Sequence, residues 1–193
     1  MTRKYSYTYL YVFIIFFVCI SCEPEYTPKP TGYLRLDFPE KKYRVYNETC
    51  PFSFEYPEYA EIVPDYSKNA EPCWLNINFP KLNGKIYLSY KKVNKNVEKF
   101  IGEARDMVYK HSIKADAIND NVFSFKDKKV YGIFYDIKGN AASSKQFFIT
   151  DSVKHFVRGA LYFNSEPNKD SLGPVINFIH QDIEKLIETF QWK

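Results

Sequence analysis

The chain has 193 residues, of which 45% are hydrophobic and 19% aromatic, so it can bury the core of one ordinary domain. Its 27 basic and 23 acidic residues give a net charge of +4, and Arg3 and Lys4 contribute to this excess before the first apolar run. No stripe of lysine and arginine with interleaved aromatic residues is present, which argues against a nucleic-acid-binding protein.

Residues 1–21 have the organisation of a signal peptide. Arg3 and Lys4 form a basic head, and residues 10–20 form an unbroken apolar run of 11 residues. A membrane-spanning helix needs about 20 apolar residues, whereas the apolar region of a signal peptide has about 7 to 15 and ends at a small residue. Ser21 is that small residue. The pattern predicts that residues 1–21 are cleaved from the exported chain.

Cys22 directly follows Ser21, and this ending resembles the lipobox of bacterial lipoproteins. In such proteins the cysteine is acylated, with palmitate among its acyl chains, and becomes the first residue of the mature chain. Cys19 stands where a lipobox usually has leucine, valine or isoleucine. We predict that Cys22 carries the lipid; an ordinary secretory signal and an uncleaved anchor are the alternatives. A redox or zinc site of Cys19 and Cys22 would need a folded domain around it.

Residues 22–33 predict an extended tether, because they contain three prolines, one glycine and no apolar period. We expect one domain over residues 34–193, since no repeat or internal linker follows. Cys50 and Cys73 are the cysteines left in this exported domain, and we predict that they form a disulfide. Such a bond would close a loop of about 22 residues and add about 3 kcal/mol to stability. Two free, buried thiols are the alternative.

The first half of the domain alternates apolar and polar residues in short runs, which predict strands over 52–56, 74–79 and 85–90. The dipeptide Asn83–Gly84 is typical of a hairpin turn, so the second and third of these strands should pair. The period then changes, because Val97, Ile101 and Val108 recur at helical spacing. We therefore expect an amphipathic helix over residues 93–111.

The second half predicts four more strands and a final helix. The strands fall at 121–125, 129–137, 145–150 and 154–163, and the helix at 170–192 with Asp170 or Ser171 as its cap. Strands joined by short turns form an antiparallel sheet, and helices must cover its faces. The expected fold class is therefore α+β, an α–β–α sandwich around an antiparallel sheet. This arrangement resembles that of the PsbP and Mog1 proteins, a likeness of fold alone.

The sequence contains few residues in catalytic patterns. It has three histidines, His111, His155 and His180, and none belongs to a metal-binding or nucleophile motif. His155 alternates with apolar strand residues, which favours a sheet position over a catalytic base or metal ligand. We expect no metal, no cofactor and no enzymatic activity.

The segment "GNAASS" interrupts two strongly apolar strands and consists of Gly139, Asn140, Ala141, Ala142, Ser143 and Ser144. It is longer than a hairpin needs, and its small residues permit close backbone approach. We predict that this loop contacts a partner and buries little area, so that Ala141→Trp or Ser143→Arg would leave the melting temperature nearly unchanged. A plain flexible connection is the alternative.

Several longer motifs in the mature chain carry a more specific resemblance. They are "CPFSFEYPEYA", "YKHSIKADAI", "VYGIFYDIKGNAASSKQFF", "TDSVKHFVRGALYF", "PNKDSLGPVI" and "IETFQWK". In order and spacing, from about Gly32 to Lys193, the chain resembles the gliding-motility lipoprotein family GldD of Bacteroidota. The resemblance implies lipidation at Cys22, a cell-envelope location, a role in gliding and a link to the type IX secretion machinery. It implies no enzyme activity and no cofactor.

The sequence therefore predicts a lipid-anchored domain that faces the periplasm and works with other gliding and secretion proteins. Its contacts would be the membrane, through the lipid, and those proteins, with no nucleic acid. The alternative is a periplasmic lipoprotein that binds a small ligand or glycan in an aromatic-lined groove. The two hypotheses differ in what co-purifies with the protein.

Overall fold

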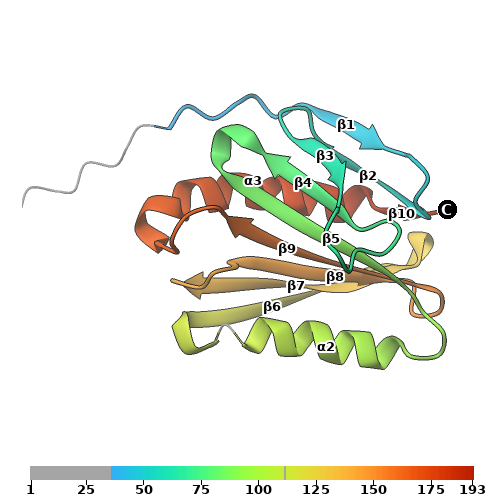
Figure 1. Ribbon diagram of the computed structural model, residues 1–193. Helices are drawn as coiled ribbons and strands as arrows, with labels where there is room; N and C mark the ends of the chain where they lie inside the picture. The colour runs from blue at the N-terminus through green and yellow to red at the C-terminus, as the bar shows by residue number, and fades with distance from the viewer. Residues whose placement is uncertain (1–35, 111) are drawn as a thin grey trace, which may run out of the picture. The chain divides into compact units, whose positions relative to one another are not determined.

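The computed structural model describes residues 36–110 and 112–193, which belong to one compact unit (Figure 1). The expected signal peptide, the tether and the acylated Cys22 lie outside these residues. Neither helix in the part described has the length and apolar character of a membrane span.

A seven-stranded antiparallel sheet forms the centre of the fold. Its strands lie in the order β3 (Glu61–Pro64), β4 (Leu75–Phe79), β5 (Gly84–Lys92), β9 (His155–Phe163), β8 (Lys145–Thr150), β7 (Val130–Gly139) and β6 (Ala115–Phe125). Short 3-10 turns connect or flank them at Pro80–Leu82, Ser112–Lys114 and Lys126–Lys128. Successive side chains in a strand point to opposite faces, so the sheet needs a cover on each side.

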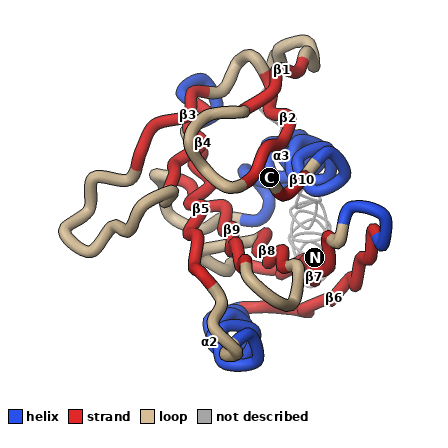
Figure 2. Tube along the Cα trace, turned by 90° about the vertical axis from the view of Figure 1, so that its right-hand side faces the viewer, coloured by secondary structure: helices blue, strands red, loops and turns tan. Residues whose placement is uncertain are grey.

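Helix α3 (Lys169–Thr189) covers one face of the sheet (Figures 1 and 2). Its apolar residues Ile179, Ile183 and Leu186 are buried, as the helical period predicts. They join the larger core cluster, to which the sheet contributes Ile77, Phe79, Ile86, Leu88, Phe134, Phe147, Ile149, Val157 and Leu161.

Helix α2 (Val97–Tyr109) lies on the opposite face, as the end-on view in Figure 2 shows. Ala104 and Val108 of the helix pack with the alternate residues of β7, β8 and β9, which are Tyr135, Ile137, Phe148 and Phe156. Helix α2 is shorter than α3, with 13 residues against 21. The buried cluster under α2 contains no residue of β4 or β5. At the end of β4 and the start of β5, this face has no residue of α2 beside it.

A second, three-stranded sheet packs on α3 and joins distant parts of the chain (Figure 1). It consists of β1 (Tyr43–Tyr46), β2 (Phe52–Pro57) and β10 (Gln191–Trp192). Phe52 and Phe54 of β2 are buried and stack with Phe190, at ring-centroid distances of 5.5 and 6.3 Å. The small sheet thus extends the core on the α3 side.

A buried carboxylate ties the segment before β1 to α3. Asp182 accepts hydrogen bonds from Lys41 Nζ at 2.7 Å, Tyr43 Oη at 2.9 Å and Tyr59 Oη at 2.5 Å. Burial, together with the carboxylate, raises the pKa of both tyrosines, so they stay protonated donors. Lys41 also lies 3.9 Å from the centroid of the Phe178 ring. This network fixes one end of the described chain against the helix.

The predicted antiparallel α–β–α sandwich is confirmed, and every predicted strand is present. Two details of the final helix differ. Asn168 is its cap, since Asn168 Oδ1 accepts hydrogen bonds from the backbone N–H groups of Asp170 and Ser171. The helix ends at Thr189, because Phe190 turns to extended backbone and the next two residues pair with β2. Strands β1 and β3, of four residues each, were not predicted.

Candidate functional site

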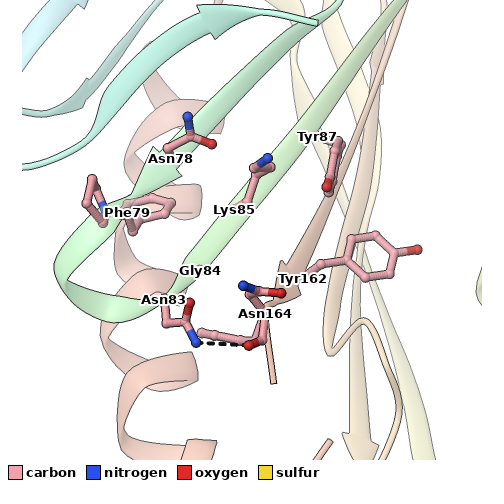
Figure 3. Close-up of a pocket in the computed structure, with 10 residues that line it drawn as sticks. Asn78, Phe79, Asn83, Gly84, Lys85, Tyr87, Tyr162 and Asn164 are labelled. Atoms are coloured by element: carbon pink, nitrogen blue, oxygen red, sulfur yellow. Dashed lines mark hydrogen bonds between the residues drawn. The ribbon is translucent and has the colours of Figure 1, made fainter. Parts of the chain in front are cut away.

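A recess lies where β4 ends, β5 begins and β9 ends, and we name it the hairpin-end recess (Figure 3). It has a volume of about 380 Å³. Its lining consists of Asn78, Phe79, Pro80, Asn83, Gly84, Lys85, Tyr87, Tyr162, Phe163 and Asn164. Three strands therefore contribute to one site that no single motif in the sequence marks.

The strand register explains why these side chains meet. Asn78, Lys85 and Tyr162 are cross-strand neighbours on β4, β5 and β9. Their sequence neighbours Ile77, Ile86 and Leu161 point into the core under α3, so this row points to the other face, where α2 does not reach. Tyr87 lies two residues along β5 on the same face.

The two tyrosines form an aromatic corner. The ring centroids of Tyr87 and Tyr162 are 5.7 Å apart and the ring planes meet at 78°. Lys85 Nζ lies 5.2 Å from the Tyr87 centroid, which is within the range of a cation–π contact. Tyr87 is 42% exposed, so one large aromatic surface stays open to solvent.

Two asparagines fix the mouth of the recess. Asn83 Nδ2 donates to the backbone oxygen of Asn164 at 3.0 Å, and the backbone N–H of Asn164 donates to the oxygen of Asn83, also at 3.0 Å (Figure 3). Asn83 has a φ of 52°, a left-handed conformation that asparagine tolerates better than most residues. The β4–β5 turn is thereby held to the end of β9.

The lining is rich in aromatic rings and amide groups. It contains one cation, Lys85, with no carboxylate, histidine, cysteine or serine. Across residues 36–110 and 112–193, no group of three or more metal-ligating side chains occurs either.

A second hollow, the β6–α3 groove, runs between the edge strand β6 and helix α3 and has a volume of about 360 Å³. Its apolar lining comes from Val122, Phe123, Phe125, Phe134 and Ile187, and its polar lining from Asn121, Asp136, His180, Glu184 and Glu188. Among the described strands β6 pairs only with β7, so its other edge presents unpaired backbone groups (Figure 2).

Charged groups of the β6–α3 groove are partly paired. Asp136 forms an ion pair with Lys145, whose side chain is buried. His180 Nε2 lies 3.4 Å from Glu184, and burial followed by the charge of Lys145 lowers the pKa of His180. The groove therefore keeps a net acidic rim at neutral pH.

Cys50 and Cys73 are joined by a disulfide in the structure, with their Cα atoms 5.6 Å apart. Cys50 is buried beside Tyr46, whose hydroxyl donates to Cys50 Sγ at 3.3 Å. The backbone of Cys73 itself is left-handed, with a φ of 64°. The bridge links the small sheet to the residue before Trp74 and β4.

The segment Gly139–Ser144 departs from expectation, because half of it is buried. Ala141 belongs to the core cluster under α2, and Ser143 and Ser144 are also buried. The segment folds back on β7, since the backbone N–H of Ile137 donates to the oxygen of Ser144 at 2.8 Å. The prediction that this loop buries little area is wrong: its residues are small because they fit a confined space.

The other residues of this segment serve its shape or remain exposed. A Cβ atom at Gly139, which has a φ of 102°, would lie 2.7 Å from the backbone nitrogen of Asp116. Asn140 Oδ1 accepts from the backbone N–H of Lys169 at 2.9 Å. Asn140 and Ala142 are the exposed residues of the segment, and the contact of this loop with a partner stays a prediction.

His155 occupies a sheet position with its ring contacts satisfied. Its Nδ1 lies 2.9 Å from Tyr90 Oη, and its ring stacks on Trp192 at 5.1 Å. Burial lowers its pKa, against the opposing charge of Asp151. His180 lines the β6–α3 groove, so the two described histidines, His155 and His180, form no common site. His111 lies outside the described residues.

The family model for "Gliding motility lipoprotein GldD" matches residues 23–192. The chain belongs to this family. The resemblance seen in the sequence motifs is therefore confirmed. Membership in a lipoprotein family places the protein at the cell envelope, in association with a membrane, and links it to gliding motility.

Two further comparisons add little to this assignment. No curated protein matches the chain. The solution structure of the cyanobacterial PsbP protein (CyanoP) from Synechocystis sp. PCC 6803 is similar with a TM-score of 0.49 and 10% sequence identity, covering 89% of this chain and 100% of that chain.

Proposed function

We propose that the protein is a non-catalytic, lipid-anchored binding component of the gliding machinery, linked to type IX secretion and facing the periplasm. The match to the GldD family over residues 23–192 carries this proposal.

The β6–α3 groove supports a contact with another protein of the machinery. Strand β6 is 11 residues long and borders a groove floored by Phe123, Phe125 and Phe134. An extended segment can add to such an edge through backbone hydrogen bonds while alternate side chains enter the groove. Because Glu184 and Glu188 line the same groove, the segment we propose carries aliphatic and basic side chains.

A matched pair of surface variants tests this contact. Val122 in β6 is 76% exposed and Val153 in the β8–β9 turn is 66% exposed, so lysine at either position removes almost no packing. Val122→Lys places a cation on the β6 edge, which should repel a basic strand and weaken gliding, type IX secretion and in-cell crosslinking to the partner. Val153→Lys should behave as the parent in all three measurements.

The decisive result is that Val122→Lys loses the partner contact without losing stability. Both variants should keep the parent's abundance and unfolding midpoint. Full gliding and secretion in Val122→Lys would overturn the assignment of the partner to β6. Equal defects in both variants would show that the effect is not specific to this edge.

The lipid anchor is tested separately at Cys22. We expect Cys22→Ala to block signal-peptide processing and to remove the lipid mass from the N-terminus, with loss of gliding. A variant that is processed normally and fractionates with membranes like the parent contradicts lipidation at this residue.

A further inference from the structure

The hairpin-end recess combines an aromatic corner, amide groups and one cation, and we propose that it binds an acidic saccharide, a sugar chain carrying a carboxylate such as a uronic acid. This inference goes beyond the proposed protein contact, which lies at β6. Its volume of about 380 Å³ is within the range of small-molecule binding pockets, which hold a ligand among a few convergent polar groups.

The tyrosines provide the apolar part of the site. A sugar ring has a face of C–H groups that packs on an aromatic ring, while its hydroxyl groups stay at the edge where polar partners can reach them. Tyr87 and Tyr162 meet nearly at right angles, so a ring lying on one has its edge against the other. Their hydroxyl groups add hydrogen-bonding capacity at the rim.

Asparagine amide groups provide the polar part. Asn78, Asn83 and Asn164 all line the recess. The Oδ1 atom of Asn78 is buried and has no hydrogen-bond partner within the structure. Buried polar atoms nearly always have a partner, so a sugar hydroxyl that reaches this acceptor would supply the bond that it lacks.

The charge of the lining selects among sugars. Lys85 is its one charged residue, so the site is cationic, and a carboxylate bound there would face no acidic neighbour in the lining. Glu61 pairs with Asn78 from the edge strand β3, but it lies outside the lining. A neutral sugar would leave the Lys85 ammonium without a counter-charge, so we expect acidic sugars to bind more tightly.

The recess is also held in shape before a ligand arrives. The paired hydrogen bonds between Asn83 and Asn164 join two loops that are 81 residues apart in the chain. Binding to a preformed site costs less conformational entropy than binding to a mobile one.

Isothermal titration of the full lipidated protein, in a detergent without a sugar headgroup, tests the proposal. The acidic probe is the hyaluronan tetrasaccharide and the neutral probe is chitotetraose, which has the same length. We expect the parent to bind the acidic probe about tenfold more tightly than the neutral one, a difference of about 1.4 kcal/mol.

Three variants localise the binding. Tyr87→Ala should weaken binding of the acidic probe about tenfold, and Lys85→Met should bring the two probes to similar affinity. Tyr109→Ala is the matched control, because Tyr109 is also 42% exposed and lies 5.5 Å from the Arg105 guanidinium, yet it is outside the recess. It should bind both probes as the parent does.

Each contrary outcome overturns the proposal. If the parent does not bind either probe at millimolar concentration, the recess is not a saccharide site. If it binds the two probes with equal affinity, the preference for acidic sugars is refuted. An equal loss in Tyr109→Ala shows that the recess is not the place of binding. Thermal unfolding of every variant checks folding, and Lys85→Met decides the matter if Tyr87→Ala is unstable.

Discussion

The two faces of the large sheet differ in how completely they are covered. On one face α3, the small sheet and the Asp182 network enclose a single continuous core. On the other face the shorter α2 packs mainly on β7, β8 and β9, and no residue of α2 lines the recess that contains Lys85 and Tyr162.

This difference separates stability from recognition. The closed face buries its largest side chains fully, including Phe52, Phe147 and Phe190. The half-open face retains amide oxygens without partners, and such atoms lower stability unless a ligand or water satisfies them. We infer that the closed face supports the fold and that the half-open face is available for binding.

The largest effect should come from a matched pair of core truncations. Ile149 on the α3 side and Ile137 on the α2 side are both strand residues with almost no exposure. We expect Ile149→Ala to lower the free energy of unfolding by about 4 kcal/mol and Ile137→Ala by about 2 to 3 kcal/mol, because the smaller cluster under α2 can relax around the cavity more easily. Urea unfolding measures both, and equal losses would contradict the difference between the faces.

Removal of the disulfide should have the next largest effect. The double variant Cys50→Ser, Cys73→Ser should lower the free energy of unfolding by about 3 kcal/mol. The two cysteines are 23 positions apart, and without the bond this loop is unconstrained in the unfolded chain. The parent under reducing conditions should show a similar loss. Non-reducing peptide mapping supplies the direct check, because two freely alkylated thiols in the native parent would refute the bond.

Bulk in the Gly139–Ser144 segment should cost less than either change but remain measurable. Ser143→Arg and Ala141→Trp force large side chains into buried positions, and we expect each to lower stability by about 1 to 3 kcal/mol. Ala142→Trp is the control, because Ala142 is exposed. An unchanged melting temperature in Ser143→Arg would show that the segment is an open loop.

The smallest effect should appear on mild acidification and should trace to the α3 side. Burial lowers the pKa of His155 and of His180, so the unfolded chain takes up protons on these rings first. Their stabilising effect is therefore full above the unfolded value of about 6.5 and is lost as the pH falls through the lower folded values. Urea midpoints between pH 8 and pH 5 should fall, and fall less in His155→Gln. An identical pH profile in that variant would contradict the assignment.

Much of the fold could be predicted because its period is long or regular. Helix α2 and helix α3 show sustained helical spacing, and the strands of the large sheet alternate or form apolar runs. Strands β1 and β3 have four residues each, too few to show a period. Gln191 and Trp192 continue the apparent helical pattern, and only their pairing with β2 makes them a strand.

The binding surfaces were harder to predict, because they depend on contacts between distant strands. Asn78, Lys85 and Tyr162 each have the pattern of an ordinary solvent-facing strand residue, and only the register of β4, β5 and β9 brings them together. At Ala141 and Ser143 the error was the reverse, because the sequence predicted an exposed loop and both residues are buried. Small polar residues are common in exposed loops, and the sequence does not show that α2 lies over this one.

The pairing of β2 with β10 has a consequence for the order of folding. Phe52 and Phe54 leave the ribosome early, but their partners Phe190 and Trp192 come about 140 residues later. Contacts between residues so distant in sequence form slowly. The apolar side of β2 therefore stays exposed while most of the chain is synthesised. The small sheet and the core beneath it can therefore close only after Phe190 and Trp192 have been synthesised.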